Sequence, residues 1–379
     1  MTKQESDLRR QLGAARRVVV KIGSQALCQP DGRLDSRTVA GLCQDLNALI
    51  DQGRQVVLVS SGAVASGTGE LGAQIVAQLE LGKQALAAIG QPLLMARYRQ
   101  EFAIAHRHVA QILLTHGDLA DRSRFLHARR VMGELLAAGV VPIINENDTV
   151  AVEELKFGDN DQLAAQVAHV VEADVLVLLT EVEGLFSANP HTDASARLLP
   201  WVGARDQLAV AAAQTATSAF GTGGMRSKVL AAQKAGAVGI VAAIGSGKSP
   251  QALLRLLNGE QVGTVFAPHA RKLQGKRSWI ATSVRGRGGL HLDSGAALAI
   301  SGGGKSLLPA GVVHVTGRFE VGDAVDLLDP QGKVIAKGLV RYASTDAASV
   351  CGLRSEQIVE LFGWLPAGEL VHRDDLVVL

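Results

Sequence analysis

Two lysines in this sequence lie where a phosphate group could bind. Lys21 is at the end of the apolar run VVVKIG and is followed by Gly23 and Ser24, so a strand runs directly into a tight turn. Such a turn brings an ammonium group and backbone N–H groups to an anion, although a lone strand-terminal lysine is more often simply solvated. Lys228 ends GTGGMRSK (221–228), a glycine loop that leads into an expected helix. Its geometry and the helix dipole favour an anion there.

A second group of residues combines hydrogen-bond acceptors and donors in the way that a small zwitterion requires. SSGAVASG (60–67) places small residues at a strand-to-helix turn, where a ligand can approach backbone amides. NEND (145–148) follows another apolar run, and FGDNDQ (157–162) comes soon after it. Residues 159–161 could cap a helix, and at least one of them is expected to do so. Two acid–amide clusters exceed what capping needs, and they suit the ammonium and carboxylate of an amino acid.

Two Gly-Lys-Ser sequences resemble the end of a P-loop but lack its first glycine. They are AAIGSGKS (242–249) and AISGGGKS (299–306). A P-loop needs a glycine five positions before the Gly-Lys pair, which allows the tight turn around the phosphates. Ala242 and Ala299 stand at that position. We therefore expect both segments to be ordinary loops.

Apolar runs alternate with helix-like segments from residue 17 to about residue 257. The expected strands are 18–23, 55–62, 109–115, 140–145, 175–180 and 238–245, and helices are expected at 36–53 and 121–139. This alternation predicts a doubly wound, mainly parallel α/β sheet. Ligands of such sheets bind at the carboxyl ends of the strands, so we expect the residues above to meet at one edge. Thr180 and Glu181, at another strand end, either form a turn or contact a nucleotide.

The pattern changes after about residue 259. Beyond the basic stretch HARKLQGKR (269–277), short alternating runs are separated by turns, and DPQG (329–332) predicts a hairpin. These features predict a second, small β-rich domain, with its boundary near 275–285.

Composition narrows the function classes. The 379 residues suggest two domains, and 47% apolar with 20% charged residues is typical of a folded chain. A net charge of +2 indicates no strong attraction to nucleic acid or membranes.

Three widely spaced cysteines fit neither a disulfide framework nor a metal site and favour a reducing compartment. The N-terminus does not read as a signal peptide, and no run reaches the roughly 18 apolar residues of a membrane span, so a cytoplasmic protein is expected.

Taken in order, these segments resemble the amino acid kinase family, in particular its members that phosphorylate glutamate in proline biosynthesis. The resemblance extends from about residue 17 to the end, and it rests on VVVKIGS, VLVSSGAVASG, ILLT, RFLHAR, VVPIINENDTV, FGDNDQLAA, VLLTEVEGLF, GTGGMRSK, SLLPAGV, VTGRF and VHRDD. The C-terminal part resembles a PUA domain, a small β-barrel. The implied organisation is a flexible N-terminal extension (1–16), a kinase domain (17–260), a linker (261–283) and a PUA-like domain (284–379).

The resemblance also implies roles for individual residues. Lys21 matches the lysine that meets the ATP phosphates, Lys228 a catalytic lysine, and Asp159 the acid that organises the catalytic lysines. Glutamate-binding positions are matched by Ser61, Asp148 and Asn160. ATP-binding positions are matched by Lys21, Thr180, Glu181, Thr222, Gly223, Gly224, Met225, Arg226, Ser227 and Lys228. The family usually has aspartate where Glu181 stands. Mg²⁺ is the expected metal, with no protein ligand assigned to it.

The same resemblance implies L-glutamate as the substrate, proline as a feedback inhibitor, a homo-oligomer, and a partner reductase that takes glutamyl phosphate. Two alternatives remain open. The acceptor could instead be aspartate or an acetylated glutamate. RNA binding through the PUA-like domain would suit the basic stretch 269–277 with Arg285 and Arg287, although the near-neutral net charge favours a solvated linker.

Overall fold

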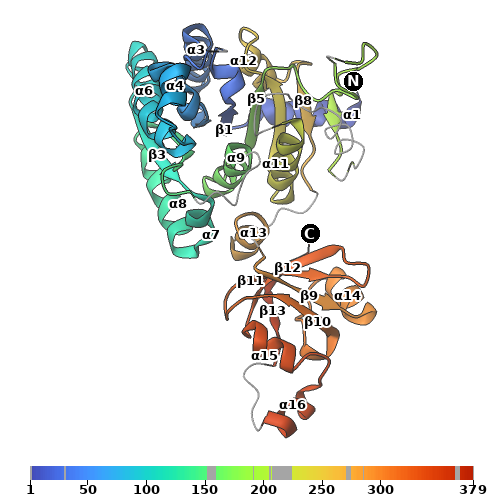
Figure 1. Ribbon diagram of the computed structural model, residues 1–379. Helices are drawn as coiled ribbons and strands as arrows, with labels where there is room; N and C mark the ends of the chain where they lie inside the picture. The colour runs from blue at the N-terminus through green and yellow to red at the C-terminus, as the bar shows by residue number, and fades with distance from the viewer. Residues whose placement is uncertain are drawn as a thin grey trace. The chain divides into compact units, whose positions relative to one another are not determined.

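The computed structural model describes residues 2–29, 31–151, 159–190, 192–204, 206, 224–269, 275–284, 286–362 and 368–378 (Figure 1). For Asp159, Ser355 and residues 361–362 it describes the backbone but not the side chain. The chain divides into two compact units, Met1–Arg271 and Lys272–Leu379.

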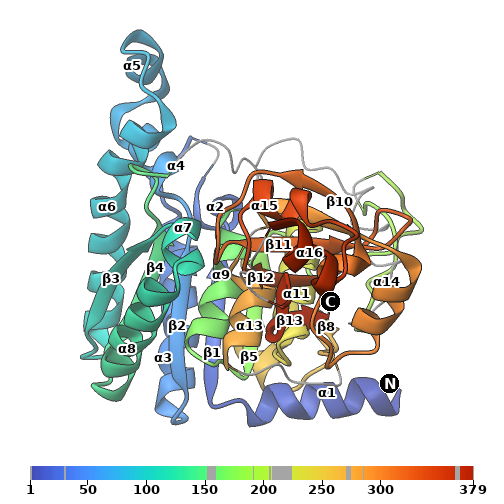
Figure 2. The same cartoon turned by 90° about the horizontal axis from the view of Figure 1, so that it is seen from below.

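The N-terminal unit is built on an eight-stranded sheet with the order β3-β4-β2-β1-β5-β7-β8-β6. Neighbouring strands run parallel except β7 and β8, which confirms the predicted doubly wound, mainly parallel sheet. Figure 2 shows β3, β4, β2, β1 and β5 side by side in this order. The strands are β1 (Arg17–Ile22), β2 (Gln55–Ser60), β3 (Val109–Leu114), β4 (Val141–Glu146), β5 (Val175–Thr180), β6 (Trp201–Val202), β7 (Val241–Ser246) and β8 (Thr264–Phe266).

Helices cover both faces of this sheet, as its nearly continuous apolar strands require. Figure 1 shows α3 and α12 on one side and α9 and α11 on the other. The helices of this unit are α1 (Lys3–Ala14), α2 (Ser24–Leu27), α3 (Ser36–Asp51), α4 (Ala63–Leu71), α5 (Ala73–Gln78), α6 (Lys83–Ile104), α7 (His116–Ala120), α8 (Arg122–Ala137), α9 (Asp159–Val170), α11 (Met225–Ala237) and α12 (Ala252–Leu257). The two helices predicted at 36–53 and 121–139 are α3 and α8, which are capped by the side chains of Asp35 and Asp121.

Strand register brings the carboxyl ends of the central strands level. Ile22 of β1 pairs with Ser60 of β2 on one side and with Leu179 of β5 on the other. On the far side of β2, Val59 pairs with Ile144 of β4. The residues that follow these four strands therefore emerge at one edge of the sheet.

The first 16 residues are not the flexible extension that we expected. Helix α1 contacts α12 and β8, and it buries Glu5 and Arg9 at 3% and 2% exposure. The Arg9 side chain donates to Glu5 Oε1 at 2.9 Å and to the carbonyl oxygens of Val262 (3.0 Å) and Pro200 (3.3 Å). A polar segment is ordered here because partners distant in sequence satisfy its charges.

The C-terminal unit contains a five-stranded sheet with the order β10-β9-β11-β12-β13, antiparallel except where β9 meets β11. The turn predicted at DPQG joins β11 to β12. Leu290, Val325 and Leu327 belong to a separate apolar core. The elements are α13 (Gly275–Thr282), β9 (Gly288–Leu292), α14 (Ser294–Ser301), a 3₁₀ turn (Pro309–Gly311), β10 (Val312–Gly317), β11 (Ala324–Leu328), β12 (Val334–Val340), α15 (Ser344–Ser349), α16 (Ser355–Phe362) and β13 (Val371–Val378).

The expected linker, residues 261–283, holds regular structure at both of its ends. Strand β8 belongs to the large sheet, and α13 packs against β13 and β12 of the small one. Both were missed because they are short and flank a basic stretch. No helix in the described part of the chain is long and apolar enough to cross a membrane.

Candidate active site

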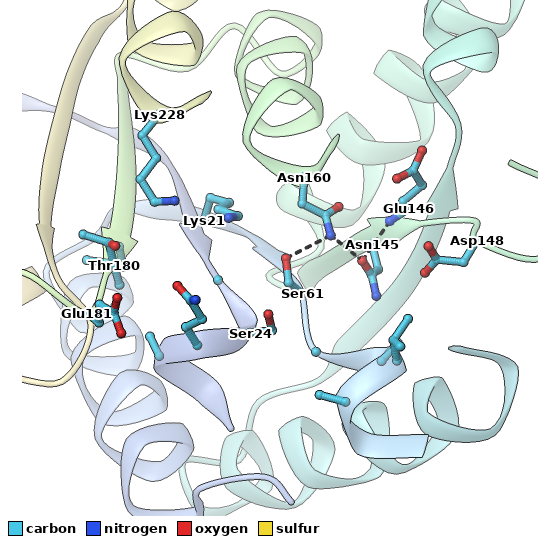
Figure 3. A pocket seen from close by; sticks show the side chains of 18 of the residues that line it. Lys21, Ser24, Ser61, Asn145, Glu146, Asp148, Asn160, Thr180, Glu181 and Lys228 are labelled. Carbon is cyan, nitrogen blue, oxygen red and sulfur yellow. Dashed lines mark hydrogen bonds between the residues drawn. The ribbon is translucent and has the colours of Figure 1, made fainter. Parts of the chain in front are cut away.

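A cavity of about 350 Å³ opens at the carboxyl ends of β1, β2, β4 and β5 (Figure 3). Lys21, Thr180, Glu181 and Lys228 line one part of it, and Asn145, Glu146 and Asp148 line the opposite part. Ser61 and Asn160 lie between the two groups. The cavity thus joins a cationic end to an end that is rich in amides and carboxylates.

The cationic end contains two buried lysines that share one carboxylate. Asp161, fully buried on α9, lies 2.5 Å from Lys21 Nζ through Oδ1 and 3.2 Å from Lys228 Nζ through Oδ2. Burial alone would raise the pKa of Asp161, but the charges of the two lysines and their hydrogen bonds outweigh it and lower that pKa. Burial, followed by the charge of Lys21, lowers the pKa of Lys228 and outweighs the opposing effect of Asp161.

Two buried ammonium groups are thus held beside one shared carboxylate at this end of the cavity. Such a site binds an anion, and a preorganised cation stabilises charge that develops on a transferred phosphoryl group. The Lys21 backbone lies within β1, while Lys228 lies on the first turn of α11. Both lysines are therefore held by rigid elements.

The position of the turn after β2 depends on glycine residues as well as on strand register, because they allow the backbone to turn and the next helices to pack closely. Gly62 has φ of +107°, a conformation that glycine adopts without strain. In α4, which follows, Gly67 lies against α6, where an added Cβ would come within 2.0 Å of the Leu86 carbonyl oxygen. A Cβ on Gly90 of α6 would come within 1.9 Å of the Ala63 carbonyl oxygen. Helix α6 thus packs directly against the turn that carries Ser61.

The amide-rich end is a connected hydrogen-bond network. Asn160 Nδ2 donates to Ser61 Oγ and to Asn145 Oδ1, both at 3.0 Å. Asn145 Nδ2 donates to Gln91 Oε1 at 2.8 Å. Burial raises the pKa of Asp148, and no hydrogen bond or ion pair of its carboxyl group is found among the described residues. A bound ammonium group would offset the cost of burying this acid.

Seven of the predicted site residues line the cavity: Lys21, Ser61, Asp148, Asn160, Thr180, Glu181 and Lys228. Four others are not among the described lining residues and lie at the start of α11, next to Lys228: Gly224, Met225, Arg226 and Ser227. Thr222 and Gly223 lie outside the described residues. Of the rejected P-loop segments, 242–249 lies in β7 and the turn that leads to α12, and 299–306 lies at the end of α14 and in the loop after it. The first therefore follows a strand–turn–helix course but has Ala242 where a P-loop needs glycine, and the second is not preceded by a strand.

Among the described side chains, Asp161 contacts both lysines, and it lies two residues after Asp159, whose predicted role in organising them stays a prediction. The side chain of Asp159 is outside the described part of the chain. Sequence reasoning also missed Lys83, an exposed cation at the cavity, and Gln91 behind Asn145. Asp161 belongs to the GDND motif already singled out, but Gln91 lies inside a long helix with no motif signal.

The fold and this site define a phosphotransferase, and comparison with known proteins agrees. Residues 16–246 match the amino acid kinase family and residues 288–362 match the PUA domain. The chain belongs to the amino acid kinase family, and it is an enzyme, a kinase, with a C-terminal PUA domain.

Its relatives narrow the comparison further. A glutamate 5-kinase from Trichormus variabilis is 47% identical over 95% of this chain and 99% of its own length. Another, from Chromohalobacter salexigens, is 46% identical over the whole of both chains. A carbamate kinase from Giardia lamblia, solved bound to AMP-PNP, shares the fold with a TM-score of 0.51 and 20% identity, over 68% of this chain and 99% of its own.

Proposed function

We propose that this kinase transfers the γ-phosphoryl group of ATP to the side-chain carboxylate of L-glutamate, giving L-glutamyl 5-phosphate, the first step of proline biosynthesis. The observation that carries the proposal is one cavity with a cationic end and an acid–amide end. The similarity to glutamate 5-kinases over nearly the whole chain supports the choice of acceptor.

At the cationic end, Lys21 and Lys228 bind the phosphates and neutralise charge on the group in transfer. A carboxylate oxygen of the acceptor forms a bond to the γ-phosphorus while the bond from that phosphorus to the β,γ-bridging oxygen breaks, and ADP leaves. The acceptor carboxylate is already ionised at neutral pH, so no general base is needed. In this proposal the nucleotide is contacted by Thr180 and Glu181, which line the same side of the cavity.

At the other end, Asp148 accepts the ammonium group of the amino acid, since a positive partner would stabilise its half-buried carboxylate. Ser61 and Asn160 lie between the two ends, within reach of a carboxylate. Lys83, at the first turn of α6, adds a positive charge suited to the second carboxylate of a dicarboxylic substrate.

Mg²⁺ fits this site as a companion of ATP. No group of three or more His, Cys, Asp or Glu side chains that could hold a metal occurs in the described part of the chain. Both Asp161 oxygens already face lysines. We therefore assign the ion mainly to the ATP phosphates, where it would neutralise charge on the β- and γ-oxygens.

The test is acceptor-dependent turnover. With ATP and Mg²⁺, L-glutamate should give ADP, and added hydroxylamine should trap the acyl phosphate as a hydroxamate. Aspartate and N-acetylglutamate are the matched alternatives. Faster hydroxamate formation with either of them would contradict glutamate as the substrate, and ADP formation that no acid stimulates would contradict the proposal as a whole.

We also propose proline as a feedback inhibitor, assembly into a homo-oligomer, and transfer of the unstable product to a reductase. These proposals rest on the family resemblance. Adding proline to the hydroxamate assay tests the first of them. Unchanged glutamate dependence at high proline concentration would contradict it.

A further inference from the structure

A chain of four side-chain amides leads from the edge strand β3 to the cavity. Gln91 Nε2 donates to Gln111 Oε1 at 3.1 Å, and Gln91 Oε1 accepts from Asn145 Nδ2 at 2.8 Å. Asn145 Oδ1 accepts from Asn160 Nδ2, and Asn160 Nδ2 also donates to Ser61 Oγ, both at 3.0 Å (Figure 3). Gln111 and Gln91 do not line the cavity, whereas the last three residues do.

The hydrogen bonds of this amide network fix which end of each carboxamide is the donor and which is the acceptor. A carboxamide has its donor and its acceptor on the same carbon, so fixing one fixes the other. Gln91 presents an acceptor to Asn145, so the Asn145 NH₂ group faces Gln91 and the Asn145 oxygen faces Asn160. That oxygen accepts a hydrogen bond from the Asn160 NH₂ group. The backbone N–H of Glu146 donates to the same oxygen at 2.9 Å and favours the same orientation. The second hydrogen of the Asn160 NH₂ group is then directed at Ser61.

The amide network ends at the hydroxyl group of Ser61, whose own hydrogen is available to donate. Ser61 Oγ accepts from Asn160, so its O–H group must donate elsewhere. Among the described residues, no hydrogen bond donated by this hydroxyl is found, and Ser61 lines the cavity. A hydroxyl group with an unused hydrogen is a good partner for a carboxylate, because hydrogen bonds to ionised acceptors are the stronger ones.

We propose that Gln91 is a positioning residue, which acts through Asn145 and Asn160 to hold the Ser61 hydroxyl group as a donor toward a carboxylate of the amino-acid substrate. This inference rests on the proposed function. Helix packing supports it, since Gly90, next to Gln91, lies against the Ala63 carbonyl group at the start of α4, two residues after Ser61. This close packing fixes the position of Gln91 relative to the cavity.

Two substitutions of Gln91 separate this role from simple packing. Gln91→Met keeps the length of the side chain but removes the acceptor, so the amides can reverse. We expect the KM for glutamate to rise roughly tenfold, equivalent to about 1.4 kcal/mol, with the KM for ATP unchanged. Gln91→Glu keeps the acceptor for Asn145 and loses the donor to Gln111. We expect it to hold the glutamate KM within about threefold of wild type.

A double-variant cycle tests whether the effect passes through Ser61. In a Ser61→Ala background, Gln91→Met should change the glutamate KM by less than about twofold, because the oriented donor is already absent. Gln100→Met, on the exposed face of the same helix, is the matched control and should leave both KM values and the melting temperature unchanged.

The inference is overturned if Gln91→Met leaves the glutamate KM unchanged, raises both KM values equally, or has its full effect without Ser61. A Gln91→Glu variant as impaired as Gln91→Met would also overturn it. Wild-type enzyme that shows no glutamate-dependent turnover would instead contradict the proposed function, so the two failures are distinguishable.

Discussion

Replacing Asp161 with asparagine takes away the negative charge that lies between the Lys21 and Lys228 ammonium groups. The carboxylate is fully buried, with lysine nitrogens at 2.5 Å and 3.2 Å. Removing one partner of a buried ion pair costs about 3–5 kcal/mol, because the buried charge loses a group that compensated it. We expect the free energy of unfolding of Asp161→Asn to fall by about this amount in urea titrations.

Activity should fall as well, and its pH dependence should change. Misplacing one preorganised charge donor lowers turnover on the order of 10²–10³-fold. The pKa of Lys228 is already lowered by burial and by Lys21. Without Asp161 it should fall further, so the alkaline limb of the kcat profile should move to lower pH, since the lysine must carry its proton to bind the phosphoryl group.

The control is Asp51→Asn, which breaks an ion pair to Arg107 in the same unit through a side chain that is 71% exposed. We expect its turnover and its pH profile to match those of wild type, because exposed pairs contribute about 0–1 kcal/mol. If Asp161→Asn retained kcat within about threefold of wild type and kept the alkaline limb in place, the shared carboxylate would not organise the lysines and our reasoning would be refuted.

Three further experiments test the scaffold. Gly90→Ala should cost about 1–3 kcal/mol in thermal unfolding and raise the glutamate KM, because the new Cβ would meet a backbone oxygen of α4, whereas Gly133→Ala, with nothing within 4 Å, should be neutral or stabilising. Arg9→Met should destabilise by about 3–5 kcal/mol in urea by leaving buried Glu5 unpaired, and adding Glu5→Gln should restore part of that loss. Burial lowers the pKa of His169 to about 3, so the unfolded chain takes up a proton near pH 6.5 that the folded chain does not. Wild type should therefore lose about 2 kcal/mol between pH 7 and pH 5 from this residue, and His169→Gln should avoid that loss.

The strands and the lysines could be predicted because their signals are local. Apolar runs between turn residues indicate buried parallel strands, and each of the six strands predicted this way overlaps an observed one. Lys21 and Lys228 were found because each adjoins a glycine turn at the end or start of an element. Such signals need no knowledge of distant partners.

The contact of Asp161 with the lysines could not be predicted without knowledge of the helix phase. Successive helical residues point about 100° apart, so the side chain that faces the lysines depends on how α9 is oriented on the sheet. That orientation comes from packing against β1 and β5. Helix α1 was not predicted for a related reason. Its Arg9 is stabilised by carbonyl groups of residues 200 and 262, which are distant in the sequence.

The first turn of α9 connects the two ends of the cavity. Asp161 holds the lysines of the cationic end, and the adjacent Asn160 holds Ser61 and the amide network. Because the two side chains leave one rigid turn in different directions, their separation is fixed by helix geometry rather than by a loop. In-line transfer needs the donor phosphate and the acceptor carboxylate at a fixed distance, and misplacement by about 1 Å can cost 10²-fold in rate. Two adjacent residues on one helix therefore set the spacing on which the transfer depends.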